Sequence, residues 1–186
     1  MDNVRLGIIG MGNIGRYHAD YLRNGKVKRC ELVAVCDAVA PLDHYKPLKI
    51  FTDGEALIKS GAVDAVLIAT PHFQHTTLGI AALEAGVHAM VEKPISSHKA
   101  DAERLIAVAQ QHPRTVFGGM FQMRTEPRYQ KVRKLITGGD LGQIVRLNWI
   151  NTDWYRTEAY FVSGGWRATW KGEGGGVLLN QCLHNL

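Results

Sequence analysis

Cysteine is scarce in this sequence, and long apolar runs are absent from it. The 186 residues include only Cys30, Cys36 and Cys182, and no two of these form a Cys-x-x-Cys pair. An odd, unpaired set argues against a disulfide framework and a zinc site, and is typical of a reducing compartment. No stretch of about 18 apolar residues occurs, which argues against a membrane-spanning helix. Because a strand pattern begins within a few residues of Met1, we expect no signal peptide and a cytoplasmic location.

Positive charge is also not concentrated enough to indicate a nucleic-acid partner. The net charge is +5, and basic residues gather at positions 23–29 and 124–134. Such runs are usually solvated helix faces, and no nucleic-acid motif accompanies them. The apolar share of 46% is normal for a globular protein, and the length suffices for one full domain and part of a second. We therefore expect no nucleic-acid partner, no membrane partner and no metal ion.

The most informative segment is a glycine-rich turn. A short apolar run leads into Gly10-x-Gly12-x-x-Gly15, after which a helical pattern opens. Gly10 permits the tight turn, Gly12 lets the backbone approach a pyrophosphate, and Gly15 allows close packing of helix on strand. The helix start supplies N–H groups and a positive dipole end for phosphate. Because glycine-rich turns are common, the three glycines alone leave an ordinary turn as an equal alternative.

A downstream carboxylate favours the dinucleotide interpretation. Residues 31–37 are predicted to form a second strand that ends in Asp37, 22 residues after Gly15. This is near the spacing expected for the acid that accepts hydrogen bonds from an adenosine ribose. Asp37 would also repel a 2′-phosphate, and Ala38 offers no guanidinium to neutralise one, so we expect NAD rather than NADP. The alternative is a solvated aspartate at a strand end.

Strand and helix patterns alternate along residues 1–120. After a loop at 38–50 that replaces a crossover helix, we expect helices near 55–60, 74–85 and 97–111, and strands at 65–69, 88–91 and 115–117. This order predicts an α/β fold, a doubly wound parallel Rossmann sheet with right-handed crossovers. We assign residues 1–120 to this dinucleotide-binding domain.

The pattern changes after residue 120. We expect a helix at 126–137 closed by two glycines, a strand at 143–152, an aromatic and glycine-rich loop at 160–176, and a helix start at 176–186. We assign residues 121–186 to the start of an α+β domain. A lone strand exposes its backbone and one apolar face, so we expect this segment to be poorly anchored or paired with another chain.

Residues that follow strands are the candidates for chemistry, because ligands of an open parallel sheet lie at the carboxyl ends of its strands. Residues 69–72 follow one strand and Glu92-Lys93-Pro94 follow another. A lysine there can hydrogen-bond a nicotinamide ribose or a substrate hydroxyl, and its charge favours a developing alkoxide. The alternative is a surface lysine before a turn proline.

A third candidate group follows three glycines near the end of the sequence. If residues 177–186 are helical, Asn180 and His184 lie four residues apart on one face. Histidine is the natural proton acceptor near neutral pH, and an adjacent amide can orient substrate or imidazole. A packing or surface histidine is the alternative, and the sequence alone does not bring His184 to Lys93.

Taken together, these motifs resemble the glucose-fructose oxidoreductase / inositol dehydrogenase / MocA family of NAD(P)-dependent oxidoreductases. The resemblance rests on the glycine motif, Asp37, Ala69-Thr70-Pro71 with His75, Glu92-Lys93-Pro94, and Gly174-Gly175-Gly176 leading to Asn180 and His184. It implies a Rossmann domain followed by a mostly antiparallel sheet domain for substrate and subunit contacts, hence a homo-oligomer. It implies that Lys93 holds the hydroxyl of a sugar or cyclic polyol, that His184 removes its proton, and that the bond before Pro94 is often cis.

The site assignments follow from the motifs and the resemblance together. Catalysis is assigned to Lys93, His184 and Asn180. NAD binding is assigned to Gly10, Gly12, Asn13, Ile14, Gly15, Asp37, Thr70, Pro71, His72, His75, Glu92 and Lys93. Further pocket candidates are Gln122, Arg124, Trp166, Arg167, Trp170 and Lys171, the last four equally suited to closing a core. Tyr17 and His18 are interpreted as packing or surface residues.

The sequence departs from the family pattern in three ways. Many relatives have aspartate where this chain has Asn180, and asparagine is common at the position of His72. Relatives also continue far past His184, so the second domain looks truncated. We predict a dehydrogenase of a sugar or polyol hydroxyl. Two alternatives stay open: a glycoside-cleaving enzyme that oxidises and re-reduces its sugar on bound NAD, and a non-catalytic NAD-binding sensor or regulator.

Overall fold

The centre of the molecule is a parallel sheet. The computed structural model describes residues 3–152, 155–163 and 165–185. The strand order is β3-β2-β1-β4-β5-β6, and every neighbouring pair is parallel. The strands are β1 (Val4–Ile9), β2 (Cys30–Cys36), β3 (Lys49–Phe51), β4 (Ala65–Ile68), β5 (His88–Glu92) and β6 (Phe117–Met120). This is the doubly wound Rossmann fold that the alternation predicts.

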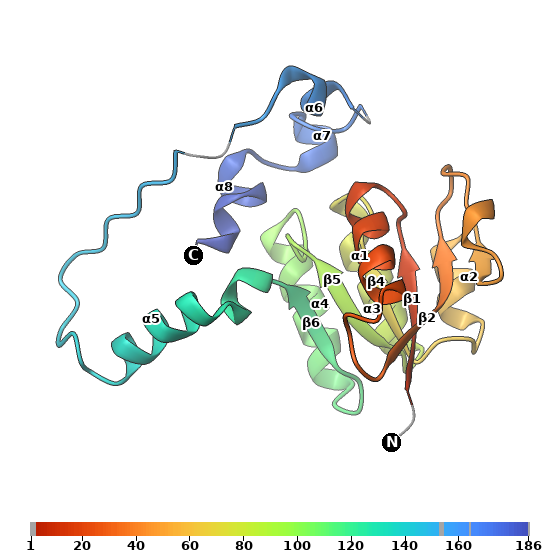
Figure 1. Ribbon diagram of the computed structural model, residues 1–186, viewed down its shortest axis with the longest axis horizontal. Coiled ribbons are helices and arrows are strands. Elements are labelled where there is room, and N and C mark those ends of the chain that lie inside the picture. Colours follow the sequence, from red (N-terminus) through yellow and green to blue (C-terminus); the bar gives the residue numbers. More distant parts are fainter. Residues whose placement is uncertain (1–2, 153–154, 164, 186) are drawn as a thin grey trace.

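Helices cover both faces of the sheet (Figure 1). The helix α1 (Asn13–Arg23) follows β1, and the others are α2 (Gly54–Lys59), α3 (Phe73–Glu84) and α4 (Lys99–Gln111). Successive residues of β1 enter different apolar cores: Ile8 packs in the core that includes Ala19 of α1, and Ile9 in the core that includes Leu83 and Leu105. Because side chains of a strand alternate between faces, α1 therefore lies opposite α3 and α4.

The segment predicted as a loop at residues 38–50 is more ordered than expected. It contains a 3-10 helix, Asp43–Tyr45, and leads into β3, which pairs with residues 34–36 of β2. Tyr45 is buried in the core on the α1 side, so the segment covers the sheet in place of a crossover helix. The strand was missed because only three residues pair, and Pro47 just before them resembles a turn signal.

The other predicted elements of this half are present with small shifts at their ends. The helices near 55–60, 74–85 and 97–111 correspond to α2, α3 and α4. The last strand begins at Phe117 rather than at residue 115. The boundary assigned at residue 120 falls between β6 and a 3-10 helix, Gln122–Thr125, and stays a prediction. No helix of the described ranges is both long and apolar enough to cross a membrane.

After β6 the chain leaves the sheet and then returns to it. The predicted helix is α5 (Pro127–Thr137), which has proline in its first turn and is followed by Gly138. Residues 138–152 extend away from the sheet (Figure 1), and no strand forms among them. The strand predicted at 143–152 is therefore wrong. Alternation alone does not make a strand, because the ladder needs a neighbouring backbone, and none pairs with this segment in the described ranges.

Three short helices bring the chain back over the carboxyl edge of the sheet: α6 (Glu158–Val162), α7 (Trp170–Glu173) and α8 (Val177–Asn180). Thr157 and Thr169 begin α6 and α7 by accepting backbone N–H groups, so the predicted loop at 160–176 is partly helical. The helix start predicted at 176–186 is confirmed at Val177, but its continuation is wrong, because α8 ends at Asn180 and a 3-10 helix, Cys182–His184, follows. Its last predicted residue, 186, lies outside the described residues.

Candidate functional site

A cleft of about 910 Å³ runs along the carboxyl ends of the central strands. The segment that carries α6, α7 and α8 forms its opposite wall. From this second wall, the lining includes Arg156, Tyr160, Ser163, Trp166, Arg167 and Asn180. Every residue assigned to NAD except Gly15 lines the same cleft. The sheet therefore brings together residues that are up to 83 positions apart in the sequence, from Gly10 to Lys93.

The three glycines of the turn meet different surroundings. Gly10 has a φ of +95°, and a Cβ built on it would lie 2.7 Å from the backbone of Ala69 and Thr70. A Cβ on Gly15 would lie 1.9 Å from the carbonyl oxygen of Gly10, so Gly15 supports the turn from behind instead of lining the cleft. A Cβ on Gly12 would meet no heavy atom of the described chain within 4 Å. The packing of the protein thus requires glycine at positions 10 and 15 but not at 12.

The open space at Gly12 fits a dinucleotide. Gly12 is the residue before α1, and no side chain caps the helix there. The first N–H groups of a helix need acceptors, and phosphate oxygens supply them in nucleotide-binding proteins. We therefore find that the turn suits the group that its sequence predicts.

Asp37 directly follows β2, and its carboxylate accepts hydrogen bonds from the backbone. Its Oδ2 accepts the N–H of Met11 at 2.7 Å, and its Oδ1 accepts those of Val39 at 2.9 Å and Ala40 at 2.8 Å. Burial opposes ionisation, but these hydrogen bonds and the charge of Arg16 outweigh it and hold the pKa of Asp37 below its ordinary value. The residue is therefore a fixed anion at this end of the cleft.

Two residues after β4 stand out: Thr70 has a buried hydroxyl without a hydrogen-bond partner in the described residues, and His75 lies between two backbone carbonyl oxygens. The Oγ1 of Thr70 is buried and makes no hydrogen bond within the described ranges, as expected for a group that faces a ligand. The ring of His75 lies between the carbonyl oxygen of Pro94, 2.7 Å from Nδ1, and that of Thr70, 2.8 Å from Nε2. Burial lowers the pKa of His75, so the neutral ring donates to one carbonyl at a time. The clamp ties the loops after β4 and β5 together.

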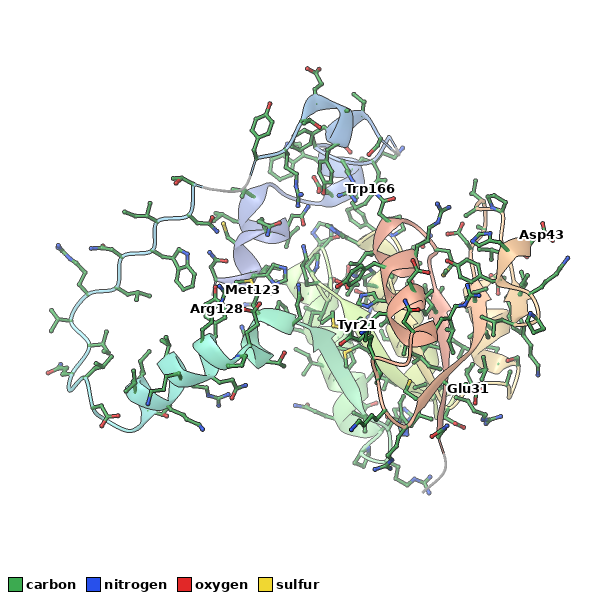
Figure 2. All side chains as sticks on the ribbon, viewed as in Figure 1. Tyr21, Glu31, Asp43, Met123, Arg128 and Trp166 are labelled. Carbon is green, nitrogen blue, oxygen red and sulfur yellow. The ribbon has the colours of Figure 1, made fainter. Side chains whose placement is uncertain are left out.

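His72 connects the Rossmann domain to the second segment. It is buried, and its Nδ1 donates to the carbonyl oxygen of Glu173 at 2.9 Å. The indole of Trp166, labelled in Figure 2, meets the His72 ring edge-on with centroids 5.1 Å apart. Burial lowers the pKa of His72, which favours the neutral form that this geometry uses. The residue thus anchors α7 over the cleft.

Lys93 lies in the cleft directly after β5. Its Nζ donates to the carbonyl oxygen of Asn180 at 2.9 Å and to the side-chain Oδ1 of Asn180 at 3.0 Å. Burial is the main cause that lowers the pKa of Lys93. The charge of Glu92 opposes the shift, and those of Arg156 and Arg167 add to it. Two residues assigned to catalysis are therefore in direct contact.

Glu173 was missed by the sequence analysis although it supports this contact. The side chain is 5% exposed, its Oε2 accepts the N–H of Ala168 at 2.8 Å, and its Oε1 accepts the Nδ2 of Asn180. An amide whose nitrogen faces a carboxylate must turn its oxygen the other way, here toward Lys93. Nothing in the pattern around three glycines marks a buried carboxylate, so only the fold identifies it.

His184 lies close to this group without lining the cleft. Its Nδ1 is buried without a hydrogen-bond partner in the described chain, and its ring meets Phe121 edge-on with centroids 6.4 Å apart. Burial and then the charge of Lys93 lower the pKa of His184, while Glu92 opposes the shift. The imidazole is therefore neutral near pH 7 and able to accept a proton.

Glu92 and some of the remaining candidate residues also line the cleft. The Oε1 of Glu92 lies 2.8 Å from the Nε2 of His18, so the interpretation of His18 as a packing or surface residue misses a hydrogen bond to the residue that precedes Lys93. Gln122 lines the cleft, whereas the guanidinium of Arg124 stacks on Phe121. Of the four pocket candidates in the aromatic segment, Trp166 and Arg167 line the cleft, while Trp170 and Lys171 are exposed and do not line it.

Family models match both parts of the chain. Residues 4–120 match the model described as oxidoreductase family, NAD-binding Rossmann fold, and residues 129–186 match the GFO/IDH/MocA C-terminal domain. The inositol 2-dehydrogenase of Salmonella typhimurium is 33% identical over 146 residues, which cover 75% of this chain and 43% of that protein. The chain thus spans about half the length of the curated relatives it matches.

Solved structures show the same arrangement. The scyllo-inositol dehydrogenase from Lactobacillus casei, crystallised with NAD(H) and scyllo-inositol, has a TM-score of 0.71 and 29% identity over 76% of this chain and 43% of that one. The WlbA dehydrogenase from Bordetella pertussis, in complex with NADH and UDP-GlcNAcA, has a TM-score of 0.84 and 26% identity over 98% of this chain and 57% of that one. The similarity to WlbA therefore extends through the second segment.

Proposed function

The chain belongs to the GFO/IDH/MocA oxidoreductase family, and we propose that it serves a dehydrogenase that transfers a hydride between NAD and a hydroxyl group of a sugar or cyclic polyol. The observation that carries the proposal is the position of Lys93, a half-buried ammonium held by Asn180 beside a neutral histidine and in the same cleft as the glycine turn. The inositol and sugar-nucleotide ligands named for the relatives support the substrate class. The domain division at residue 120 and a homo-oligomer formed through the second domain remain part of the proposal.

The proposed binding mode follows the length of the cleft. Asp37 would accept hydrogen bonds from the adenosine ribose, the turn at Gly12 would face the pyrophosphate, and Thr70 would offer its hydroxyl near the nicotinamide half. When bound, NAD supplies the carbon that accepts the hydride. The protein contributes alignment of the two reactants and exclusion of water.

The proposed proton chemistry uses three side chains. Lys93 would donate a hydrogen bond to the reacting hydroxyl and stabilise the negative charge that grows on its oxygen. Asn180, held by Glu173, keeps the ammonium in place. His184, which lies close to Lys93 and is held neutral by burial, would accept the hydroxyl proton.

The direct test is NAD reduction, followed by the absorbance of the reduced nicotinamide, over a panel of inositols and aldoses. The proposal expects NADH to accumulate with at least one member of the panel. Release of a glycoside leaving group without net NADH formation would instead favour the glycoside-cleaving alternative. NAD binding without turnover of any panel member would favour a sensor.

The pH dependence of kcat/KM is expected to be bell-shaped. His184 must be neutral to accept a proton, and burial lowers its pKa from the ordinary histidine value, so activity should persist at neutral pH and fall as the solution becomes more acidic. Lys93 must be charged, and its pKa lies below 10.5, so activity should fall again before that pH is reached. In Lys93→Arg, whose guanidinium keeps its charge, the upper fall should disappear. A lower inflection above pH 6.5 would contradict the proposed role of His184.

Asp37→Asn is expected to weaken the preference for NAD over NADP by about 10-fold or more. The amide keeps the size of the side chain but removes the charge that repels a 2′-phosphate and one strong acceptor for ribose hydroxyls. Dissociation constants for NADH and NADPH, measured by their fluorescence, give the ratio. The matched control is Asp43→Asn, an exposed carboxylate outside the cleft that is labelled in Figure 2. An unchanged ratio in Asp37→Asn would count against Asp37 as the ribose acid.

A further inference from the structure

The side-chain amide of Asn180 lies between a cation and a carboxylate. Its Oδ1 accepts a hydrogen bond from the Nζ of Lys93 at 3.0 Å, and its Nδ2 donates to the Oε1 of Glu173. The backbone carbonyl oxygen of Asn180 accepts a second hydrogen bond from the same Nζ at 2.9 Å. An ammonium has three N–H groups, so Lys93 keeps one without an acceptor in the described residues, and this one is available to a substrate hydroxyl.

Glu173 sets the orientation of this amide. Both of its oxygens accept hydrogen bonds, Oε2 from the N–H of Ala168 at 2.8 Å and Oε1 from the Nδ2 of Asn180. An ionised carboxylate has no donor, so it admits only the nitrogen end of an amide. A reversed amide would set two acceptors against each other at Glu173 and would point its N–H groups at the ammonium of Lys93. Glu173 thus excludes the orientation that repels Lys93.

His72 holds the backbone that carries Glu173. Its Nδ1 donates to the carbonyl oxygen of Glu173 at 2.9 Å, and its ring packs edge-on against Trp166. His72 belongs to the loop between β4 and α3, which lines the cleft. Because α7 has only four residues, it depends on such tertiary contacts for its position. The hydrogen bond from His72 therefore fixes Glu173 relative to the sheet.

A second contact docks the same backbone on the Rossmann domain. Gly174 has a φ of +79°, and a Cβ built on it would lie 2.7 Å from the Cβ of Ser97. Ser97 lies in the loop between β5 and α4. Loops that follow two neighbouring strands thus hold positions 173 and 174. The carboxylate of Glu173 is placed by the fold, unlike that of a surface side chain.

We propose that Glu173 is a positioning residue of the reaction, which acts on Lys93 through the amide of Asn180, and that His72 acts in turn through Glu173. The inference rests on the proposed function and connects the loop after β4 to the catalytic ammonium. The role of His72 requires no contact with NAD. What the site needs is one carboxylate and one amide at positions 173 and 180, because their donors and acceptors must match.

The test exchanges the carboxylate and the amide, with kcat measured on the best substrate of the inositol and aldose panel. Glu173→Gln and Asn180→Asp should each lower kcat by about 10-fold or more. The first lets the amide of Asn180 reverse, and the second sets two carboxylates side by side. In the double variant, the amide at position 173 can accept from Ala168 and donate to the new carboxylate at position 180, whose other oxygen faces Lys93.

The double variant should therefore recover kcat to within about 3-fold of wild type, a rescue that loss of structure does not give. The matched control is Glu103→Gln, at an exposed carboxylate of α4 outside the cleft, which should retain wild-type kcat. A double variant no better than the worse single variant would overturn the proposal.

The pKa of Lys93 distinguishes positioning from structural support without any turnover. Burial lowers this pKa, and the charge of Glu173 opposes the shift, so Glu173→Gln should lower it further. Loss of a merely structural contact would instead expose Lys93 to water and raise its pKa toward the ordinary lysine value. The other groups that act on Lys93 or lie near it stay in place in this variant: Glu92, Arg156, Arg167, His72 and His184.

The ¹³Cε resonance of Lys93, assigned by its absence from Lys93→Met, reports this pKa in each variant. The double variant brings a carboxylate into contact with Lys93, so there the pKa should exceed that of wild type. A pKa that is unchanged or raised in Glu173→Gln would refute the role of Glu173.

Variants of His72 test the first step of the chain of contacts. His72→Leu removes the donor and should lower kcat by about 10-fold, whereas His72→Asn, whose Nδ2 can donate from a similar place, should retain most of it. Because His72 acts through Glu173, adding His72→Leu to Glu173→Gln should cause little further loss. Losses that multiply in the double variant would remove His72 from the proposal.

The two kinds of measurement separate this inference from the proposed activity. A lowered pKa of Lys93 in Glu173→Gln, with no NAD reduction by wild type on any panel member, would sustain the contacts and reject the dehydrogenase. NAD reduction that requires Lys93 but is unchanged in Glu173→Gln would do the reverse.

Discussion

Lys93→Met is expected to lower kcat for NAD reduction by about 10²- to 10⁴-fold. The methionine fills nearly the same volume but offers neither a hydrogen bond to the reacting hydroxyl nor a charge for the oxygen that becomes negative. The affinity for NADH should change much less, because the glycine turn and Asp37 are untouched. The loss should therefore appear in kcat rather than in cofactor binding.

Unfolding does not explain such a loss. Lys93 is half-buried, and burial disfavours its charged form, so the uncharged methionine removes a desolvation cost along with the hydrogen bonds to Asn180. Urea unfolding should place the two proteins within about 1 to 2 kcal/mol. Lys99→Met, at an exposed side chain in the first turn of α4, is the matched control and should retain wild-type kcat. Wild-type turnover in Lys93→Met would remove Lys93 from the mechanism.

Alanine at two glycines of the same turn is expected to give opposite results. Gly10→Ala should destabilise the protein by more than about 3 kcal/mol, because its φ of +95° is strained for alanine and its Cβ would press on the backbone of Ala69 and Thr70. Gly12→Ala should leave the stability unchanged or raise it by up to about 1 kcal/mol, since its φ is −70° and the described chain leaves space for a methyl group. The affinity of Gly12→Ala for NADH should nevertheless fall by about 100-fold.

This pair separates what the fold needs from what the ligand needs. Urea unfolding gives the stability of each variant, and the fluorescence of NADH gives its dissociation constant. A stable Gly12→Ala protein that binds NADH as wild type does would show that no pyrophosphate approaches position 12. A Gly10→Ala protein of wild-type stability would show that the turn is not built as the structure has it.

The Rossmann domain could be predicted because each of its signals is local. Glycine spacing, strand runs and helix periods each depend on residues close together in the sequence, and the parallel topology follows from their alternation. The three-residue strand β3 was not predicted, because its pairing with residues 34–36 of β2 depends on residues that are distant in the sequence. Strand-end positions such as Lys93 could be placed in the cleft for the same topological reason.

The second segment could not be predicted to the same depth because its structure depends on long-range contacts. The alternation at residues 143–152 suits a strand, yet no neighbouring backbone pairs with it in the described chain. The helix expected at 177–186 breaks at Gln181, so Asn180 reaches Lys93 from the end of α8 and His184 from a separate 3-10 turn. The sequence thus identified Asn180 and His184 as candidate site residues, but it did not predict the backbone that positions them.

The residues that the sequence analysis missed share one property: each acts through a partner that is distant in the sequence. Glu173 is buried against Asn180, and His18 pairs with Glu92 of β5. Arg156 shares the Tyr160 ring with Arg167. No periodicity marks such residues, because burial and charge neighbours appear only once the chain is folded.

The most direct test of the account is a crystal structure of the protein grown with saturating NAD. We predict electron density for the dinucleotide along the cleft, with the adenosine ribose at Asp37, the pyrophosphate over Gly12 and the nicotinamide beside Lys93. Density in the reverse orientation, at another site, or absent from the cleft altogether would contradict it.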